Sequence, residues 1–441
     1  MSAGTLPSAA ASPNTAALAS AAALPNAAAL PNASALPLTL YVHMPWCVRK
    51  CPYCDFNSHQ LPSAAPSADY IDALIRDFES ELADLGGRPI DSIFFGGGTP
   101  SLFPPEAFAR LLDAFATRTP LAAHVEVTLE ANPGTIERGR FAGYRDAGIN
   151  RVSLGAQTFA PHSLERLGRI HSPADTFRAV EELHAAGLHN FNLDLMYALP
   201  EQKLEEALED VRRACALEPR HISHYQLTLE PGTAFHSRPP PLPDEEVAYR
   251  MQSDCQALLA DNGFEQYEVS AYARDGARCR HNLNYWRFGD YVGIGAGAHG
   301  KITASLPHGI ERTEKARQPR AYLEQVARIA QGGGTERNGA IERSGSTERA
   351  GGAAPHGGRI GERKPVPASD LPFEFMLNAL RLNEGFALAD FESRTGLGAS
   401  AVEPGLRAAL KRGLVEFAPP RWRPSAFGRR FLNDLQAGFL P

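Results

Sequence analysis

Three cysteines stand within eight positions of the segment CVRKCPYCDFNSH. Thiolates at Cys47, Cys51 and Cys54 can converge on one metal centre, because this spacing forms a short loop around a small object. A zinc ion would require a fourth ligand, for which His43 and His59 are near enough in the chain. An iron–sulfur cluster is normally ligated at every iron, so three thiolates would leave one iron free for an exogenous ligand. Three buried cysteines that bind no metal would explain this close spacing less well than either kind of metal site.

Glycine and polar residues recur near the carboxyl ends of consecutive predicted strands. In parallel α/β folds these ends meet at one face of the sheet, where ligands and catalytic groups gather. Each residue alone fits a surface or capping position equally well, but their joint placement favours a shared site. The positions are Gly97, Gly98 and Thr99 in the segment GGGTP, Glu130 and Asn132 in EANPGT, Gln157 in RVSLGAQTF, and Asp194 in NFNLDLMY.

The elements that must position these residues are short β-branched or aromatic runs that alternate with amphipathic segments. Tyr70, Leu74, Phe78 and Leu82 recur at helical spacing and predict a buried helix face. Strand–helix alternation of this kind predicts a parallel sheet, open or curled into a barrel. Predicted strands cover 38–44, 91–97, 124–131, 150–156, 190–197 and 222–229, and predicted helices cover 67–85, 104–117, 135–147, 174–186 and 202–217.

The composition divides the chain into four parts. Residues 1–37 are almost only Ala, Ser, Pro, Asn and Leu, which predicts a disordered tail, and their lack of Lys and Arg argues against a secretory signal or a mitochondrial presequence. Residues 38–330 are expected to form the barrel and an extension of it. Residues 331–367, rich in Gly, Ser, Arg and Glu, are expected to be a solvated insertion or linker. Helical patterning returns in residues 368–441 and suggests a small winged-helix-like domain.

Charge, hydropathy and cysteine usage exclude several classes of protein. The 441 residues carry a formal net charge of -6 without a basic block, so binding of nucleic acid by bulk electrostatics has no support. No run approaches the ~18 apolar residues of a transmembrane helix, which leaves at most a transient contact with membrane respiratory complexes. Six cysteines are too few for a disulfide scaffold and indicate reduced thiols, and therefore a cytoplasmic location.

The C-x3-C-x2-C spacing, directly after the first predicted strand, resembles the radical S-adenosylmethionine superfamily. The resemblance implies that the three cysteines ligate a 4Fe–4S cluster and that S-adenosylmethionine chelates the fourth iron. In that family the residue before the third cysteine is typically aromatic, as Tyr53 is here. The resemblance further implies that Glu130 and Asp194 accept hydrogen bonds from the ribose or the ammonium group, and that Gln157 and Arg169 serve the ribose and the carboxylate. The implied cofactor-binding residues are Tyr41, Tyr53, Gly97, Gly98, Thr99, Glu130, Gln157, Arg169 and Asp194.

The segments YVHMPWC, GGGTP, EANPGT and RVSLGAQTF resemble one branch of that superfamily. This branch holds oxygen-independent coproporphyrinogen III dehydrogenase (HemN) and the heme chaperone HemW. The resemblance runs from Tyr41 to about Leu435 and implies an α/β fold, a partial (β/α)6 TIM-like barrel followed by a small C-terminal helical domain. Two departures weaken the dehydrogenase interpretation. Phe56 stands where that enzyme has a further cysteine, and the Ala/Pro tail replaces its structured N-terminal extension.

The segment CRHNLNYW, residues 279–286, favours the chaperone side of the branch. The pattern H-N-x-x-Y-W is characteristic of HemW proteins and is connected there with heme binding. His281 would supply an imidazole for the heme iron, and Tyr285 and Trp286 would offer flat faces to the porphyrin. A histidine among aromatic residues can equally be a packed, hydrogen-bonded core residue, and Cys279 is an alternative thiolate ligand.

The resemblance therefore implies a heme chaperone that binds heme, a 4Fe–4S cluster and S-adenosylmethionine, and that delivers heme to client proteins such as respiratory cytochromes. Two alternatives stay open. One is an enzyme, a radical oxidoreductase that decarboxylates coproporphyrinogen III oxidatively, although the two departures weigh against any enzyme. The other is a zinc-stabilised α/β binding protein.

Overall fold

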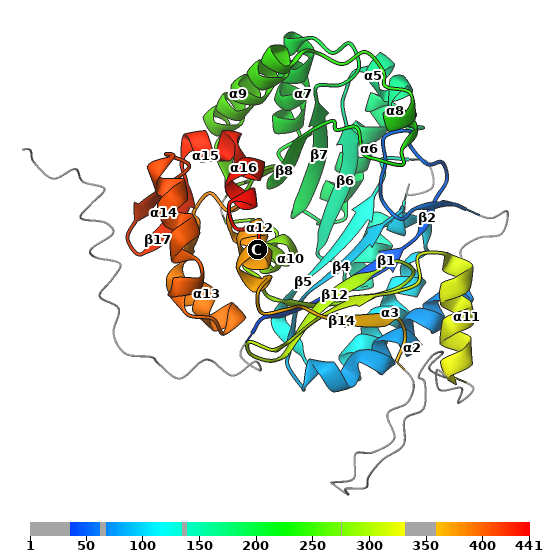
Figure 1. The fold of residues 1–441 in the computed structure, drawn as a ribbon. Helices are drawn as coiled ribbons and strands as arrows, with labels where there is room; N and C mark the ends of the chain where they lie inside the picture. The colour runs from blue at the N-terminus through cyan, green and yellow to red at the C-terminus, as the bar shows by residue number, and fades with distance from the viewer. Residues whose placement is uncertain (1–35, 62–67, 135–138, 275, 331–358) are drawn as a thin grey trace, which may run out of the picture.

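A computed structural model of the chain describes residues 36–61, 68–134, 139–274, 276–330 and 359–441 (Figure 1). Its main sheet has twelve strands in the order β14-β13-β12-β11-β1-β4-β5-β6-β7-β8-β10-β9. Seven adjacent strands at its centre run parallel. They are β1 (Leu38–Met44), β4 (Ile90–Gly97), β5 (Leu121–Ala131), β6 (Arg151–Gln157), β7 (Phe191–Tyr197), β8 (His221–Gln226) and β11 (Asp290–Ile294). The six predicted strands are thus confirmed, with small shifts at their ends.

Antiparallel strands extend both edges of the parallel sheet. One edge carries β12 (His299–Ser305), β13 (Gly309–Glu314) and β14 (Glu362–Pro365), and the other carries β10 (Ala271–Ala273) and β9 (Glu265–Gln266). The two outermost strands, β14 and β9, do not pair with each other, so the described sheet is an open, partial barrel. This confirms the predicted fold class.

Helices cover the outer face of the sheet because their apolar stripes face it. In α2 (Ala68–Leu85), Tyr70, Leu74 and Phe78 are fully buried, as their helical spacing predicts. The other helices of this part are α3 (Pro105–Ala116), α4 (Phe141–Asp146), α5 (Pro161–Arg166), α6 (Pro173–Ala185), α7 (Leu204–Ala216), α8 (Ala234–Ser237), α9 (Glu245–Asp261), α10 (Arg280–Trp286) and α11 (Pro319–Ala330). The first residues of the helix predicted over 135–147 lie outside the described residues.

The C-terminal part has a core of its own, which includes Phe375, Phe391 and Trp422. Its helices and a three-stranded antiparallel sheet resemble a winged helix, and it lies beside α10 in Figure 1. The predicted C-terminal helical domain is therefore confirmed. Its elements are α12 (Leu371–Ala379), β15 (Phe386–Ala387), α13 (Leu388–Thr395), α14 (Glu403–Lys411), β16 (Val415–Ala418), β17 (Arg421–Pro424), α15 (Ala426–Arg430) and α16 (Leu432–Ala437).

The folded residues extend into both ends that were expected to be unstructured, the end of the tail and the end of the linker. Leu36 is buried, and the carbonyl of Pro37 accepts a hydrogen bond from the amide of Asp290, so these two residues belong to the folded part. The expected linker 331–367 ends earlier as well, because residues 362–365 form β14 on the edge of the sheet and Ile360 is buried in the main core. Residues 1–35 and 331–358 lie outside the described residues. In the part that is described, no helix is both long and apolar enough to cross a membrane.

Candidate functional site

After the carboxyl end of β1, Cys47 ends the short strand β2 (Trp46–Cys47), and Cys51 and Cys54 lie on the loop that leads to β3 (His59–Gln60). The amide of Cys54 donates a hydrogen bond to the carbonyl of Cys51 at 3.2 Å and tightens the loop. All three thiols are free and partly exposed, whereas the remaining three cysteines are buried elsewhere. Burial raises the pKa of the Cys47 and Cys54 thiols, so a bound metal centre is what would hold them as thiolates.

The glycine segment after β4 packs directly against this loop. The amide of Gly98 donates to the carbonyl of Met44, and the amide of Thr99 donates to the carbonyl of Trp46, both at 2.8 Å. A side chain at position 98 would start 2.5 Å from the Trp46 carbonyl oxygen, so only glycine permits this approach. The Thr99 hydroxyl in turn donates to the sulfur of Cys47 at 3.4 Å. The structure therefore brings GGGTP and the cysteine loop together, as the sequence predicts.

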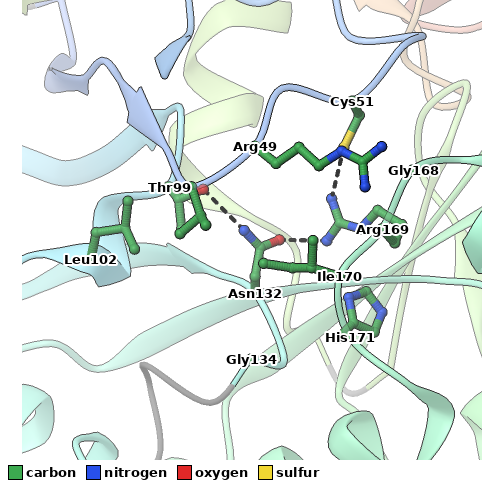
Figure 2. A pocket seen from close by; sticks show the side chains of 11 residues that line it. Arg49, Cys51, Thr99, Leu102, Asn132, Gly134, Gly168, Arg169, Ile170 and His171 are labelled. Atoms are coloured by element: carbon green, nitrogen blue, oxygen red, sulfur yellow. Dashed lines mark hydrogen bonds between the residues drawn. The ribbon is translucent and has the colours of Figure 1, made fainter. Parts of the chain in front are cut away.

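Arg169 connects the cysteine loop to the ends of β5 and β6 (Figure 2). Its guanidinium donates to the sulfur of Cys51 at 3.7 Å and to the carbonyl of Gly155 at 2.9 Å. It also donates to the side chain of Asn132, which itself donates to the Thr99 hydroxyl at 3.0 Å. Asn132 is a member of this site that the sequence placed at a strand end without giving it a role. A cavity opens beside these residues, and its rim includes Arg49, Ile170 and His171.

Two carboxyl groups, Glu130 on β5 and Asp194 on β7, lie in the interior of the barrel. Glu130 accepts a hydrogen bond from the amide of Gly97 at 3.1 Å, and burial together with the nearby Asp194 raises the pKa of Glu130 to about 8. Burial also raises the pKa of Asp194, against hydrogen bonds from Asn192 and Ser153 that lower it. A cationic ligand group beside this pair would stabilise the ionised forms of both carboxyls.

The remaining predicted cofactor residues surround the same interior. Gln157 ends β6 with a φ of 66°, a left-handed conformation that is strained for this residue type, and its side chain accepts a hydrogen bond from the Tyr225 hydroxyl at 2.9 Å. The Tyr41 hydroxyl is 3.0 Å from Nδ1 of His43. Tyr53 lies within the cysteine loop and packs against Phe235. Strained backbone at a strand end is typical of ligand-binding sites.

We expect the buried Glu130 carboxyl to make the stability of the cofactor-free chain pH-dependent. Its pKa of about 8 lies above the ordinary value of 4.5, so the folded state binds a proton that the unfolded state releases between these two values. The free energy of unfolding should therefore fall as pH rises through this window. Glu130→Gln keeps an acceptor for the Gly97 amide, and it should become more stable than the parent by a few kcal/mol at about pH 8.5, with the difference shrinking toward about pH 5. Urea denaturation across this range measures it, and a difference that does not change with pH contradicts the assignment.

The structure gives no support to a zinc site completed by a nearby histidine. The imidazole of His43 is held on both sides, by the Tyr41 hydroxyl at Nδ1 and by the Asn57 carbonyl 2.8 Å from Nε2. His59 lies 3.3 Å from the carbonyl of Arg317. Within the described residues, no group of three or more His, Cys, Asp or Glu side chains is arranged to hold a single metal ion.

His281 lies on α10, far from the cysteine loop and near the amino ends of the strands. Its side chain is 1% exposed, Nδ1 is 3.1 Å from the Ser92 hydroxyl, and Nε2 is 3.2 Å from the Tyr285 hydroxyl. The ring also stacks on Phe94 with centroids 5.1 Å apart. Burial lowers the pKa of His281 to about 3, so the imidazole is neutral. In this arrangement His281 is a packed, hydrogen-bonded residue, one of the two possibilities that the sequence left open.

The two aromatic residues of the same segment are also engaged within the protein. Tyr285 packs edge-on against Tyr291 at 4.3 Å, and the guanidinium of Arg381 lies 4.2 Å above the ring of Trp286. The indole nitrogen of Trp286 is buried and has no hydrogen-bond partner among the residues that the structure describes. The structure thus groups the CRHNLNYW residues with one another and with the C-terminal domain, but it does not bring them to the cysteine loop. Tyr41 lies between the two regions, with its ring centroid 6.3 Å from that of His281.

Comparisons with known proteins agree with this geometry. Residues 41–214 match the family model of the radical SAM superfamily, and residues 366–431 match that of the HemN C-terminal domain. The chain is 45% identical over 404 residues to the heme chaperone HemW of Escherichia coli, covering 91% of this chain and 98% of the relative. It is 38% identical over 299 residues to the mitochondrial radical S-adenosyl methionine domain-containing protein 1 of Mus musculus, covering 66% and 67% of the two chains. The solved structure of the coproporphyrinogen III oxidase HemN from Escherichia coli superposes with a TM-score of 0.72 at 20% identity over 92% of each chain, which supports the fold.

A partial barrel with this cysteine loop and this C-terminal domain defines a radical S-adenosylmethionine protein of the HemN type. Within that class the chain belongs to the HemW family. Membership implies a 4Fe–4S cluster and S-adenosylmethionine, and the residues present fit them. Three free thiols share one loop, and the glycine segment packed against it leaves no room for a side chain at position 98.

Proposed function

We propose that this chain is a cytoplasmic heme chaperone that binds heme and transfers it to heme proteins such as respiratory cytochromes. The observation that carries the proposal is the near-complete coverage of HemW relatives, 98% of each, at 45% identity. The cavity beside the cysteine loop and the two interior carboxyls support a nucleoside cofactor in addition to heme.

In this proposal Cys47, Cys51 and Cys54 would hold the cluster, and the chain's own residues would bind and orient S-adenosylmethionine beside it. Arg169 and the backbone of the glycine segment would serve its carboxylate and amino group, and the interior carboxyls would accept hydrogen bonds from its polar groups. The proposed cofactor residues are those that the resemblance implied: Tyr41, Tyr53, Gly97, Gly98, Thr99, Glu130, Gln157, Arg169 and Asp194.

The proposed heme ligand is His281, flanked by Tyr285 and Trp286. Because both ring nitrogens have hydrogen-bond partners, ligation requires the imidazole to leave Tyr285 or Ser92. Each such hydrogen bond contributes about 1 kcal/mol net, which iron coordination can readily offset. Heme binding should therefore be accompanied by a local rearrangement of α10.

We expect His281→Ala to weaken the binding of added heme by about tenfold or more, because loss of an axial imidazole removes a direct bond to iron. Tyr285→Phe is a more specific companion variant. It removes the hydroxyl that contacts Nε2 of His281 but keeps the imidazole and the aromatic ring at position 285, so it should preserve or tighten heme binding. His308→Ala, an exposed histidine, serves as the matched control. The measurement is a heme titration followed by absorption spectroscopy. An unchanged affinity and spectrum in His281→Ala would remove His281 from the heme site.

The fold likeness to HemN supports a second candidate, oxidative decarboxylation of coproporphyrinogen III. Phe56 argues against it, because it stands where the dehydrogenase has a further cysteine. Its side chain is 59% exposed in this structure. Anaerobically reconstituted protein, incubated with coproporphyrinogen III, S-adenosylmethionine and a reductant, distinguishes the candidates. Formation of protoporphyrinogen would establish the enzyme, whereas stoichiometric heme binding without turnover supports the chaperone.

A further inference from the structure

A continuous chain of hydrogen bonds crosses the barrel interior, from the cofactor region to the start of α10. Asp194 accepts from the side-chain amide of Asn192 at 2.8 Å. The amide oxygen of Asn192 lies 2.6 Å from Nδ1 of His221, and Nε2 of His221 lies 2.8 Å from the hydroxyl of Tyr267. That hydroxyl accepts from the backbone amide of Cys279 at 3.2 Å, and Cys279 is the N-cap residue of α10. Four hydrogen bonds therefore join two regions that the sequence predicted separately.

The direction of every donor in this chain is determined. The Asn192 amide nitrogen must face Asp194, because the reversed amide would place its oxygen against a carboxylate. Its oxygen can then only accept, so Nδ1 of His221 carries the proton. A neutral imidazole has one N–H, so Nε2 accepts from the Tyr267 hydroxyl, which leaves the hydroxyl oxygen to accept from the Cys279 amide. All donors point from α10 toward Asp194.

The surroundings hold these protonation states. Asn192, His221 and Tyr267 are each at most 1% exposed, so water does not compete for their bonds. Burial, together with the neighbouring Arg151 cation, keeps the pKa of His221 well below its usual value and the ring neutral. Burial raises the pKa of Asp194, and the hydrogen bonds that it accepts and the Arg151 cation oppose that rise. Aligned hydrogen bonds of this kind polarise one another, so a change at one end is felt at the other.

The far end of the chain also reaches the C-terminal domain. The carbonyl of Tyr267 accepts a hydrogen bond from the amide of Asn383 at 3.0 Å, and the next residue, Glu268, pairs with Leu382 and with the guanidinium of Arg381. Arg381 is the residue that lies over Trp286. Tyr267 is thus the junction between the barrel interior, α10 and the C-terminal domain.

We propose that Asn192, His221 and Tyr267 are positioning residues that link occupancy of the cofactor site at Asp194 to the arrangement of α10 and of the C-terminal domain. This inference rests on the proposed function, which places S-adenosylmethionine at one end of the chain and heme at the other. A ligand group that donates to Asp194 competes with Asn192 for the carboxyl group. The weakened hydrogen bond between Asn192 and Asp194 then alters the hydrogen bonds of His221 and Tyr267 in turn. By linkage, S-adenosylmethionine and heme then change each other's affinity by the same factor.

The test uses the reconstituted holoprotein and the variant Tyr267→Phe, which removes only the linking hydroxyl. Tyr272→Phe is the matched control. Tyr272 is also buried and lies nearby on β10, but it is not part of the series of hydrogen bonds. Hydrogen exchange of the α10 amides is measured with and without S-adenosylmethionine, and heme affinity is measured under the same two conditions. Should Tyr267→Phe fail to fold, His221→Gln breaks the chain at another link.

We expect S-adenosylmethionine to change exchange in α10, and to change heme affinity by about fivefold or more, in the parent and in Tyr272→Phe but not in Tyr267→Phe. Equal responses in all three proteins, or no response in the parent, would overturn the inference. Heme binding without a transmitted response refutes the linkage and leaves the chaperone function standing. A response in α10 without heme binding supports the linkage and refutes the chaperone function. If S-adenosylmethionine does not bind, the cofactor assignment and the linkage both fail.

Discussion

Replacing Cys51 with alanine is expected to abolish the iron–sulfur cluster and, with it, tight binding of S-adenosylmethionine. A cluster held by three thiolates cannot lose one of them without exposing a second iron, because no other thiol lies on the loop. The parent should take up about four irons per chain on anaerobic reconstitution, and the variant less than about one. Iron and sulfide analysis with absorption spectroscopy measures the first effect, and equilibrium dialysis of S-adenosylmethionine measures the second.

Cys215→Ala is the matched control, since Cys215 is a free cysteine buried on α7, away from the loop. It should keep the full iron content. Arg169→Lys adds a separate readout, because Arg169 donates to the Cys51 sulfur and to Asn132. We expect this variant to retain the cluster and to bind S-adenosylmethionine about tenfold less tightly, since lysine cannot reproduce the forked contacts. Full iron content in Cys51→Ala, or zinc in place of iron in the parent, would contradict the assignment of the loop.

The strands and the polar residues at their ends could be predicted because the sequence signals for them are local. Segments such as 91–97 and 124–131 are short, contain branched or aromatic residues, and are followed by glycine or polar residues. Parallel topology then brings their carboxyl ends to one face without further information. This is why Thr99 and Arg169, seventy residues apart in the sequence, share Asn132 as a hydrogen-bond partner.

Contacts between distant segments were not accessible in the same way. The segment RKP of β14 reads as part of a polar linker, because nothing in its composition reveals that Arg363 meets Glu81 and Asp84 of α2. Likewise, the resemblance of H-N-x-x-Y-W to a heme-binding pattern implies an iron ligand, but the segment cannot reveal that Ser92, on a distant strand, contacts the same imidazole. The roles of Asn192 and Tyr267 depend on partners from different strands, and only the fold brings those partners together.

Lys315→Met is expected to lower the free energy of unfolding by about 3–5 kcal/mol, the largest stability change that we predict. The ammonium group of Lys315 lies 2.7 Å from Asp77 and 2.6 Å from Glu81, and these three side chains are at most 2% exposed. It also donates to the carbonyl of Ile360 at 2.9 Å, so it fastens the segment before β14 to α2. Methionine fills a similar volume but takes from Asp77 and Glu81 the cation that they share, so that Glu81 keeps only its pair with Arg363.

Lys364→Met is the matched control, because Lys364 is exposed on β14. Among the described residues its one ion pair is with the exposed Glu362, a contact worth about 0–1 kcal/mol. Asp77→Asn in the Lys315→Met background should recover part of the loss, since it removes one of the two buried carboxylates that lose Lys315. Urea denaturation of all three variants measures the effect. A loss below about 1 kcal/mol in Lys315→Met would mean that Arg363, which also pairs with Glu81, carries the attachment alone. A loss of the expected size would show that Lys315 and Arg363 are both needed for the attachment. The segment after the linker would then contribute to the stability of the barrel.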